Sequence, residues 1–183
     1  MRALACIMVL ATTIAFNLAA MGPAAAESKK ISDFFGVYSG QSISATGEGL
    51  SARDLSVTIK RTGDGFNVSW TTVTHRADKS ASRKSYSIDF AKSARKNVWG
   101  SAVRKDAFGN MRPVNPLNEG EVFVWATLRK STLTIYALLI ADDGGYELQT
   151  YARMLTAKGM NLRFTRLRDG EKQRAITGVL IKK

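Results

Sequence analysis

Short runs in which every second residue is apolar constrain this chain more than any other feature of its sequence. Apolar residues occupy alternate positions of 55–59 and of 66–70, and Thr-Gly-Asp-Gly lies between the two runs at 62–65. A period of two indicates strands with one buried face, because successive side chains of a strand point to opposite sides. The glycine-rich turn between the runs predicts a β-hairpin.

The rest of the chain beyond residue 26 follows the same plan. Turn signals recur about every ten residues, and the strands that they separate extend from 36–44 to 176–181, about nine in all. Residues 33–35 fit a short helical turn. A polar loop is expected over 75–84, and 106–120 reads as a long irregular segment that would cap one end of a barrel.

Three segments are less simple. Residues 122–128 and 133–141 are apolar on both faces, which predicts central strands or a covered outer face. Residues 146–155 fit a helix as well as a strand. We favour the strand, because tight turns flank it on both sides, and its face is expected to comprise Tyr146, Leu148, Thr150, Ala152 and Met154.

Sequential strands joined by short turns predict an all-β protein. The expected fold is an antiparallel up-and-down meander that closes into a barrel of about 8–9 strands, since closure removes exposed sheet edges. The alternative is a β-sandwich. A barrel of this size is filled by side chains or holds one small ligand.

The first 26 residues predict a cleaved signal peptide. Arg2 precedes an almost uncharged apolar run over 3–20, Gly22-Pro23 follows, and small residues at 24–26 fit a cleavage site. The alternative is an uncleaved membrane anchor. We therefore expect one β-barrel domain over 27–183, located in the periplasm or secreted, and not transmembrane once the signal has been removed. Its only cysteine, Cys6, lies within the signal, so the mature domain forms no disulfide.

The charge of the chain is strongly basic. There are 27 Lys and Arg against 15 Asp and Glu, and loss of Arg2 with the signal leaves 26 against 15, a formal net charge of +11. Nine basic residues and two acidic ones lie within 76–105. Such a field attracts anionic lipid or polymer of a bacterial envelope, whereas export makes nucleic acid a poor partner. The residues predicted for an anionic surface are Arg83, Lys84, Arg95, Lys96, Arg104 and Lys105. The alternative is a basic, soluble surface with no specific partner.

Sequence motifs for catalysis are absent. His75 is the only histidine, which predicts no metal site, and no nucleophile elbow of the G-x-S-x-G type occurs. The paired carboxylates of Asp142 and Asp143 stand beside two glycines, where a turn explains them. We therefore expect no cofactor and predict that the protein is not an enzyme.

Aromatic residues on the predicted strands suggest a site inside the barrel. Ligand pockets are concave, largely apolar and sparsely polar, and the candidate ligand-binding residues are Tyr38, Trp70, Tyr86, Trp125 and Tyr136. The alternative is that these side chains only pack the core.

The segment Asp-Phe-Phe-Gly-Val-Tyr at 33–38 resembles the opening of the calycin superfamily, which includes the lipocalins. There a short helical turn leads into Gly-x-Trp, so Gly36 matches the glycine and Tyr38 replaces the tryptophan. The resemblance implies a closed barrel that often holds an apolar small molecule. It also implies a late basic residue packed across the aromatic ring, for which Arg163 and Arg166 are the candidates. The chain also resembles a group of uncharacterised exported bacterial proteins.

Two functions follow as hypotheses. The first is an exported, non-enzymatic protein that holds a small apolar or amphipathic molecule inside a barrel. The alternative is an envelope protein that docks by a basic face on anionic lipid or polymer.

Overall fold

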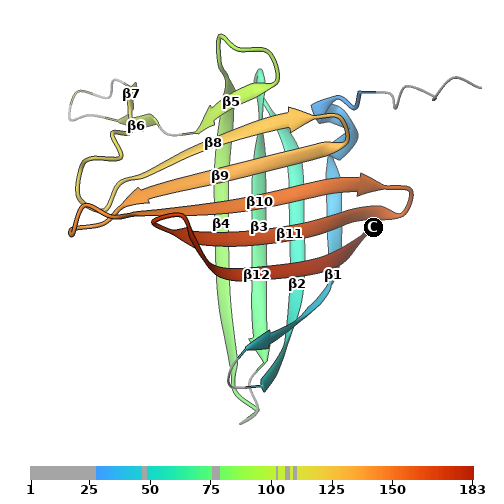
Figure 1. Cartoon of the computed structure of the whole chain (residues 1–183). Coiled ribbons are helices and arrows are strands. Elements are labelled where there is room, and N and C mark those ends of the chain that lie inside the picture. The colour runs from blue at the N-terminus through green and yellow to red at the C-terminus, as the bar shows by residue number, and fades with distance from the viewer. Residues whose placement is uncertain (1–27, 47–48, 76–78, 102, 106–107, 109–110) are drawn as a thin grey trace, which may run out of the picture.

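The computed structural model describes residues 28–46, 49–75, 79–101, 103–105, 108 and 111–183. A 3-10 helix, η1, precedes twelve strands (Figure 1). Their bounds are η1 Ile31–Phe34, β1 Gly36–Thr46, β2 Gly49–Thr62, β3 Gly65–His75, β4 Ala81–Lys92, β5 Val98–Ser101, β6 Val103–Lys105, β7 Met111–Pro113, β8 Val122–Arg129, β9 Thr132–Ile140, β10 Tyr146–Thr156, β11 Gly159–Arg168 and β12 Glu171–Lys182.

Ten of the strands form one closed barrel in the order β1-β12-β11-β10-β9-β8-β5-β4-β3-β2, and every pairing is antiparallel. This confirms the expected all-β meander and its closure. The segment expected to be irregular at 106–120 contains β7, which pairs with β6 in a separate two-stranded sheet. The predicted polar loop at 75–84 is shorter than expected, because β3 includes His75 and β4 begins at Ala81.

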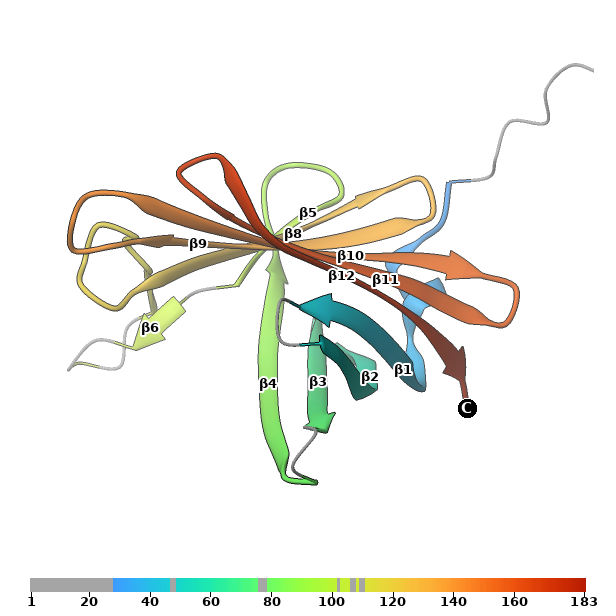
Figure 2. The same cartoon turned by 60° about the horizontal axis from the view of Figure 1, so that its bottom comes forward.

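The barrel is closed tightly at one end only. β1 and β12 pair through four positions, from Tyr38 opposite Lys182 to Gln41 opposite Val179. β5 is equally short and pairs through three positions with each of β4 and β8. Beyond these short bridges β1–β4 and β8–β12 are not paired with each other, and Figures 1 and 2 show the two groups of strands crossing. The barrel thus has a closed end and an open end.

A glycine allows the seam between β1 and β12 to form. A Cβ atom at Gly40 would lie 1.9 Å from the carbonyl oxygen of Val179, so any side chain there would clash with backbone. The close approach of the two strands at this point therefore requires glycine.

The closed end holds the densest part of the core. Phe66 stacks on Phe90 with a 5.0 Å centroid distance, and the Trp99 ring packs against Phe66 edge-on at 5.4 Å. Aliphatic side chains from the opposite group of strands complete this layer, namely Leu128, Leu133, Met160 and Leu180. The predicted hairpin at 55–70 contributes to it as expected, because Ile59 and Val68 are buried and face each other across β2 and β3.

Tyr38 joins η1 to the barrel at this end. Its ring is fully buried, its hydroxyl donates a 2.8 Å hydrogen bond to the Phe34 carbonyl, and burial raises its pKa. Lys182 Nζ lies 5.7 Å from the centre of the ring. Gly36 makes room for that lysine, because a Cβ atom there would lie 2.6 Å from Lys182 Cε, and its φ of +151° disfavours a side chain.

This contact corrects the choice of a basic residue across the aromatic ring. Neither Arg163 nor Arg166 covers Tyr38. Arg163 is paired with Ala152 and Thr177, on the outward phase of its strand, and Arg166 bonds Glu147. The sequence could not choose the residue because the β1–β12 seam, which brings Lys182 to Tyr38, depends on a long-range register.

Strand β10 confirms the strand prediction for 146–155 and excludes the helix. Its predicted face is wrong, however. Tyr146, Leu148, Thr150, Ala152 and Met154 lie on the outward phase. The buried or half-buried side chains that face the interior are Glu147, Gln149, Tyr151, Arg153 and Leu155.

Strands β8 and β9 are apolar on both faces for two different reasons. Val124 and Ile135 point into the barrel, whereas Trp125 and Tyr136 stack on its outer side with a 4.8 Å centroid distance. The predicted signal peptide at 1–26, with Cys6, lies outside the described residues. Within the described part of the chain, no helix has the length and apolarity needed to cross a bilayer.

Removal of the Tyr38 hydroxyl should destabilise the closed end. Tyr38→Phe leaves the Phe34 carbonyl without its buried donor, and we expect a loss of about 1–2 kcal/mol in the free energy of unfolding, measured by urea denaturation. Tyr146→Phe is the control, because Tyr146 is exposed, and should change this free energy by less than about 0.5 kcal/mol. Equal effects of the two substitutions would contradict the role given to the Tyr38 bond.

Candidate functional site

The two groups of strands line a cavity of about 220 Å³, part of whose wall, at Lys84 and Tyr86, is exposed to solvent. One wall comes from β1–β4 and the other from β10–β12, so the site is built from residues far apart in the sequence. Ser42 and Arg174 line it from β1 and β12, beyond the point where these two strands stop pairing. The cavity therefore belongs to the open end of the barrel. A second internal pocket of about 290 Å³ adjoins it and shares Trp70, Tyr86 and Tyr151.

A row of four aromatic rings crosses the interior from one wall to the other. Tyr86 stacks on Trp70 at 5.1 Å, Trp70 contacts Tyr151 at 5.4 Å, and Tyr151 contacts Phe164 at 4.8 Å. All four rings line the cavity. Rings at such distances interact favourably in offset or tilted arrangements, so the row joins the two walls and offers flat apolar surface to a ligand.

Positive charge is concentrated in the same cavity. The basic residues that line it are Arg53, Lys84, Arg153 and Arg174, and among the described residues no Asp or Glu lines it. Arg53 is 7% exposed and its Nε donates to Thr74 Oγ1 at 3.3 Å. Burial, followed by the positive charge of Arg174, lowers the pKa of Arg53. Two guanidinium groups thus repel each other near the mouth.

Arg153 is the most unusual residue of the cavity. It is 1% exposed and lies on β10 opposite Leu133 and Leu162, directly above the packed end. Its Cζ atom is 5.5 Å from the centre of the Trp70 ring and 5.7 Å from that of Tyr151. Cation–π contacts of this kind stabilise a guanidinium group only partly. Burial lowers the pKa of Arg153 to about 10.

The hydrogen bonds of Arg153 are incomplete. Its Nη1 donates to the Tyr151 carbonyl at 3.5 Å, which is a long contact, and its Nε has no hydrogen-bond partner among the described residues. Ser42 Oγ is the other buried side-chain atom without such a partner in the described part of the chain, and Ser42 lines the same cavity. Buried polar groups are nearly always bonded, so two exceptions in one place indicate a binding site.

A carboxylate network occupies the adjoining pocket. Glu147 accepts hydrogen bonds of 2.6 Å from Arg166 Nε and from Gln149 Nε2, and Gln149 accepts one of 2.7 Å from the Tyr151 hydroxyl. Burial alone would raise the pKa of Glu147, but the hydrogen bonds from Gln149 and Arg166 lower it overall. Desolvation, the largest cause, raises the pKa of Tyr151 to about 12. Glu147 is thus charged and engaged by Arg166.

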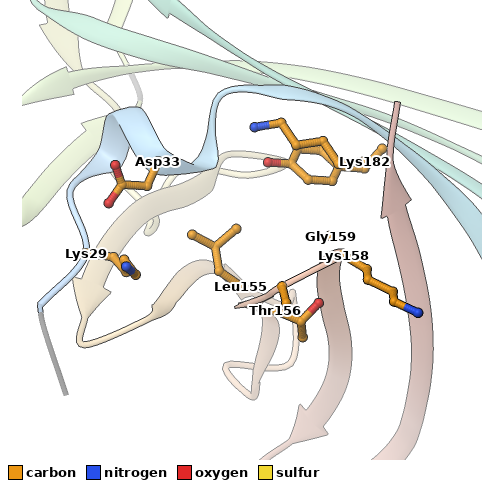
Figure 3. A pocket seen from close by; sticks show the side chains of 9 residues that line it. Lys29, Asp33, Leu155, Thr156, Lys158, Gly159 and Lys182 are labelled. Atoms are coloured by element: carbon orange, nitrogen blue, oxygen red, sulfur yellow. The ribbon is translucent and has the colours of Figure 1, made fainter. Parts of the chain in front are cut away.

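A larger hollow of about 780 Å³ lies at the closed end. Figure 3 shows Asp33 and Lys182 beside it, with Thr156 and Lys158 on its other side. These four side chains are exposed. Both buried atoms without partners lie in the other cavity, so we place the functional site at the open end despite the smaller volume there.

The structure places the five predicted ligand-binding aromatics in three locations. Trp70 and Tyr86 line the cavity. Tyr38 is buried at the closed end, and Trp125 and Tyr136 lie outside the barrel. The prediction that the last two present an interior surface is wrong, because their neighbours Val124 and Ile135 occupy the inward phase of β8 and β9.

The six basic residues predicted for an anionic surface do not form one face. Arg83 and Lys84 lie near the start of β4, whereas Arg95 and Lys96 lie in the turn beyond its end. Lys84 also faces the cavity. Lys84 and Lys92 are eight residues apart on this strand, a distance of about 26 Å. Arg104 and Lys105 belong to β6, whose side chains lie outside the described part of the structure.

The two other polar groups singled out in the sequence lie away from the cavity. His75 Nε2 is 2.8 Å from Asp54 Oδ2, and both side chains are half exposed. Asp143 accepts a hydrogen bond from the Gly145 amide and two from Arg168, as a turn residue would. Among the described residues no three His, Cys, Asp or Glu side chains gather as a metal site would require.

Sequence reasoning missed Arg153, Arg53, Arg174 and Ser42. A signal exists for two of the arginines, because Arg53 is two residues before Leu55 and Arg174 is two before Ile176. For Arg153 it does not, because most apolar residues of β10 occupy the opposite phase. A basic residue in phase with apolar neighbours predicts a charge inside the barrel. For Ser42 no such signal exists.

Comparison with known proteins gives little further guidance. No family model matches the chain, and no curated protein matches it. The chain is similar to a solved structure titled "Structure of S-type Phycobiliprotein Lyase CPES from Guillardia theta", with a TM-score of 0.35 and 10% sequence identity, covering 84% of this chain and 90% of that chain. A likeness at this level assigns neither a family nor an activity. The closed barrel implied by the calycin resemblance is present, and membership of that superfamily stays a prediction.

One expectation requires correction, because the prediction that the protein is not an enzyme is not supported. It rested on the absence of local catalytic motifs alone, and the solved structure reported above is titled a lyase. The physical reason is that a barrel assembles its interior groups from distant strands, as Arg153 and Arg174 show, so that no local motif is needed.

Replacement of Arg153 by an apolar residue should stabilise the ligand-free protein. With a pKa of about 10, Arg153 is charged at pH 7 in the folded and unfolded chain, so folding bears the full cost of burying that charge. The cost fades only as the pH rises above this value. We expect Arg153→Met to raise the free energy of unfolding by about 1–3 kcal/mol, measured by urea and thermal denaturation at pH 7.

Arg163→Met is the matched control for this experiment. Arg163 lies on the neighbouring strand, in register with Ala152, and is exposed on the outer side. Its replacement should change the free energy of unfolding by less than about 0.5 kcal/mol. A clear loss of stability in Arg153→Met would contradict the view that the buried charge lacks a partner.

Proposed function

We propose that this protein binds a small amphipathic molecule inside its barrel. The observation that carries the proposal is the internal cavity of about 220 Å³, whose wall combines four contacting aromatic rings with a few polar groups. Sites of this kind, largely apolar with a small number of convergent polar groups, are typical of small-molecule binding.

The architecture supports this proposal. The closed end is filled by aromatic and aliphatic side chains and supplies the stability, while the sheets separate at the other end and leave space. A barrel packed throughout would show neither the cavity nor two buried polar atoms without partners beside it. The proposal leaves open whether the bound molecule is carried or converted.

Docking on an anionic envelope surface is the weaker proposal. It requires basic residues gathered on one face, and the described members of the predicted set are divided between the two ends of β4. We therefore propose the cavity, and no surface patch, as the place where this protein meets its partner.

A substitution that fills part of the interior should weaken binding. Ala137 lines the adjoining internal pocket from β9, and Ala137→Trp should weaken binding of the fluorescent probe N-phenyl-1-naphthylamine by at least about tenfold, measured by fluorescence titration. Ala152→Trp is the control, because Ala152 lies on the outward phase of β10, and should bind as the parent does. Failure of the parent protein to bind the probe, together with native mass spectrometry that finds no copurified small molecule, would contradict the proposal.

We further propose that the protein acts in the periplasm or outside the cell, after removal of residues 1–26. Expression of the whole chain in a Gram-negative bacterium, followed by fractionation and N-terminal sequencing, should give a periplasmic protein that begins at Glu27. The substitutions Leu10→Arg and Ile14→Arg together should keep it in the cytoplasm, because they interrupt the apolar run. A chain that stays in the cytoplasm with residue 1 or 2 at its start would contradict the export proposal.

A further inference from the structure

We propose that the cavity recognises an organic anion, and that Arg153 binds its negatively charged head. The ligand class is a flat apolar body that carries a carboxylate, phosphate or sulfonate group. This inference rests on the proposed function and adds the charge and the binding residue to it.

The first argument is the state of the Arg153 side chain. The residue is 1% exposed and lines the cavity, and its Nε lacks a hydrogen-bond partner among the described residues. A buried charge is strongly unfavourable unless it is paired and hydrogen-bonded. The planar fork of arginine matches a carboxylate or phosphate group better than any neutral partner. An anionic ligand is therefore the partner that this side chain lacks.

The second argument is that the described residues supply no anion at this place. Glu147 is the nearest acidic residue along β10, but it is six residues away, about 20 Å of strand, and both of its oxygens accept hydrogen bonds from Gln149 or Arg166. Within the described residues the lining of the cavity contains no carboxylate. Among the described groups none neutralises Arg153, and we infer that the negative charge comes with the ligand.

The third argument is the arrangement of charge around Arg153. Arg53, Lys84 and Arg174 line the same cavity. Like charges in a cleft with low-dielectric walls focus an attractive field on an anion. Ser42 adds an uncharged donor, since its buried hydroxyl has no partner among the described residues. These groups favour entry of an anion and its retention above the packed end.

The rest of the cavity wall limits the shape and size of the apolar part of the ligand. Trp70, Tyr151 and Phe164 present ring surfaces, which suit a flat apolar group. Pockets for drug-sized molecules run from about 300 to 1,000 Å³, so a cavity of about 220 Å³ suits a smaller body of about two fused rings.

Two probes, one with a charged and one with a neutral polar head, test the proposal. 2-Naphthoate and 2-naphthylmethanol share the same ring system, and isothermal titration calorimetry at pH 7 measures the dissociation constant of each for the whole mature protein. We expect the carboxylate to bind at least about tenfold more tightly, as a charge-assisted hydrogen bond to arginine requires. Inorganic phosphate should bind at least about tenfold more weakly than 2-naphthoate, because it lacks the apolar body. Its dissociation constant is measured by competition against 2-naphthoate.

Three substitutions assign the preference to residues. Arg153→Met should remove the preference for the carboxylate and leave binding of the alcohol within about threefold. Arg163→Met, with its side chain outside the barrel, should leave both constants unchanged. Ser42→Ala, a smaller change that also serves if Arg153→Met fails to fold, should weaken 2-naphthoate binding severalfold without affecting the alcohol.

The outcomes separate the two proposals. Equal binding of both probes by the parent protein would overturn the anion assignment and keep the amphipathic cavity. Unaltered carboxylate binding in Arg153→Met, or in Ser42→Ala if the former is unfolded, would overturn the role of these residues. If phosphate bound as tightly as 2-naphthoate, the inference that the ligand has an apolar body would be overturned. Absence of binding for both naphthalene probes and for N-phenyl-1-naphthylamine would count against the proposed function itself.

Discussion

The structure depends on an unequal closure of its hydrogen-bonded wall. A barrel needs every strand to have two partners, and here the two joining seams are only three or four pairs long. Both seams lie at the same end, where Tyr38, Phe66 and Trp99 fill the interior. Pairing along the seams satisfies the backbone hydrogen-bonding groups of the strand edges at that end. Because the seams are short, β1–β4 diverge from β8–β12 at the other end. The packed core that stabilises the domain and the cavity therefore lie at different ends of the barrel.

The second constraint is electrostatic. A small domain is stable by only about 5–15 kcal/mol, and a buried guanidinium group without a carboxylate opposes folding. Arg153 is retained at the base of the cavity, between the Trp70 and Tyr151 rings, where an apolar side chain would pack with less cost. Groups that lower the stability of a fold are expected at functional sites, because binding requires features that folding alone does not favour. This contrast makes Arg153 more informative than the aromatic residues around it.

Much of the fold followed from local sequence pattern. The 55–70 hairpin and the strand at 146–156 were predictable because alternation and flanking turns agree. The orientation of β10 was not, because its apolar residues Leu148 and Met154 point outward while Glu147 and Arg153 point inward. Hydrophobicity assigns a face only where the interior is apolar, and a polar cavity reverses the rule. The seam of Tyr38 with Lys182 was equally hidden, since no local feature specifies a contact between strands so far apart.

The sequence indicated only some of the residues that line the cavity, because the inward phase of each strand was not known. Trp70 and Tyr86 lie in the cavity as expected of aromatic residues on strands, but Trp125 and Tyr136 occupy the opposite phase. Comparison with a neighbour that points inward, such as Val124, would have placed them outside the barrel, because adjacent residues of a strand point to opposite sides. The same test applied to basic residues would have found Arg53 and Arg174, but not Arg153, because most apolar residues of β10 occupy the opposite phase.

The position of β12 in the chain has a consequence for assembly. It is the twelfth strand in order and yet pairs with both β11 and β1, so no N-terminal portion of the sequence contains a finished cylinder. Until β12 emerges during synthesis, the edges of β1 and β11 remain unpaired, and their backbone N–H and C=O groups can pair with other chains. Completion is thus a late, long-range event, and a nascent form kept incomplete until then is compatible with passage through a translocation channel as an extended polypeptide.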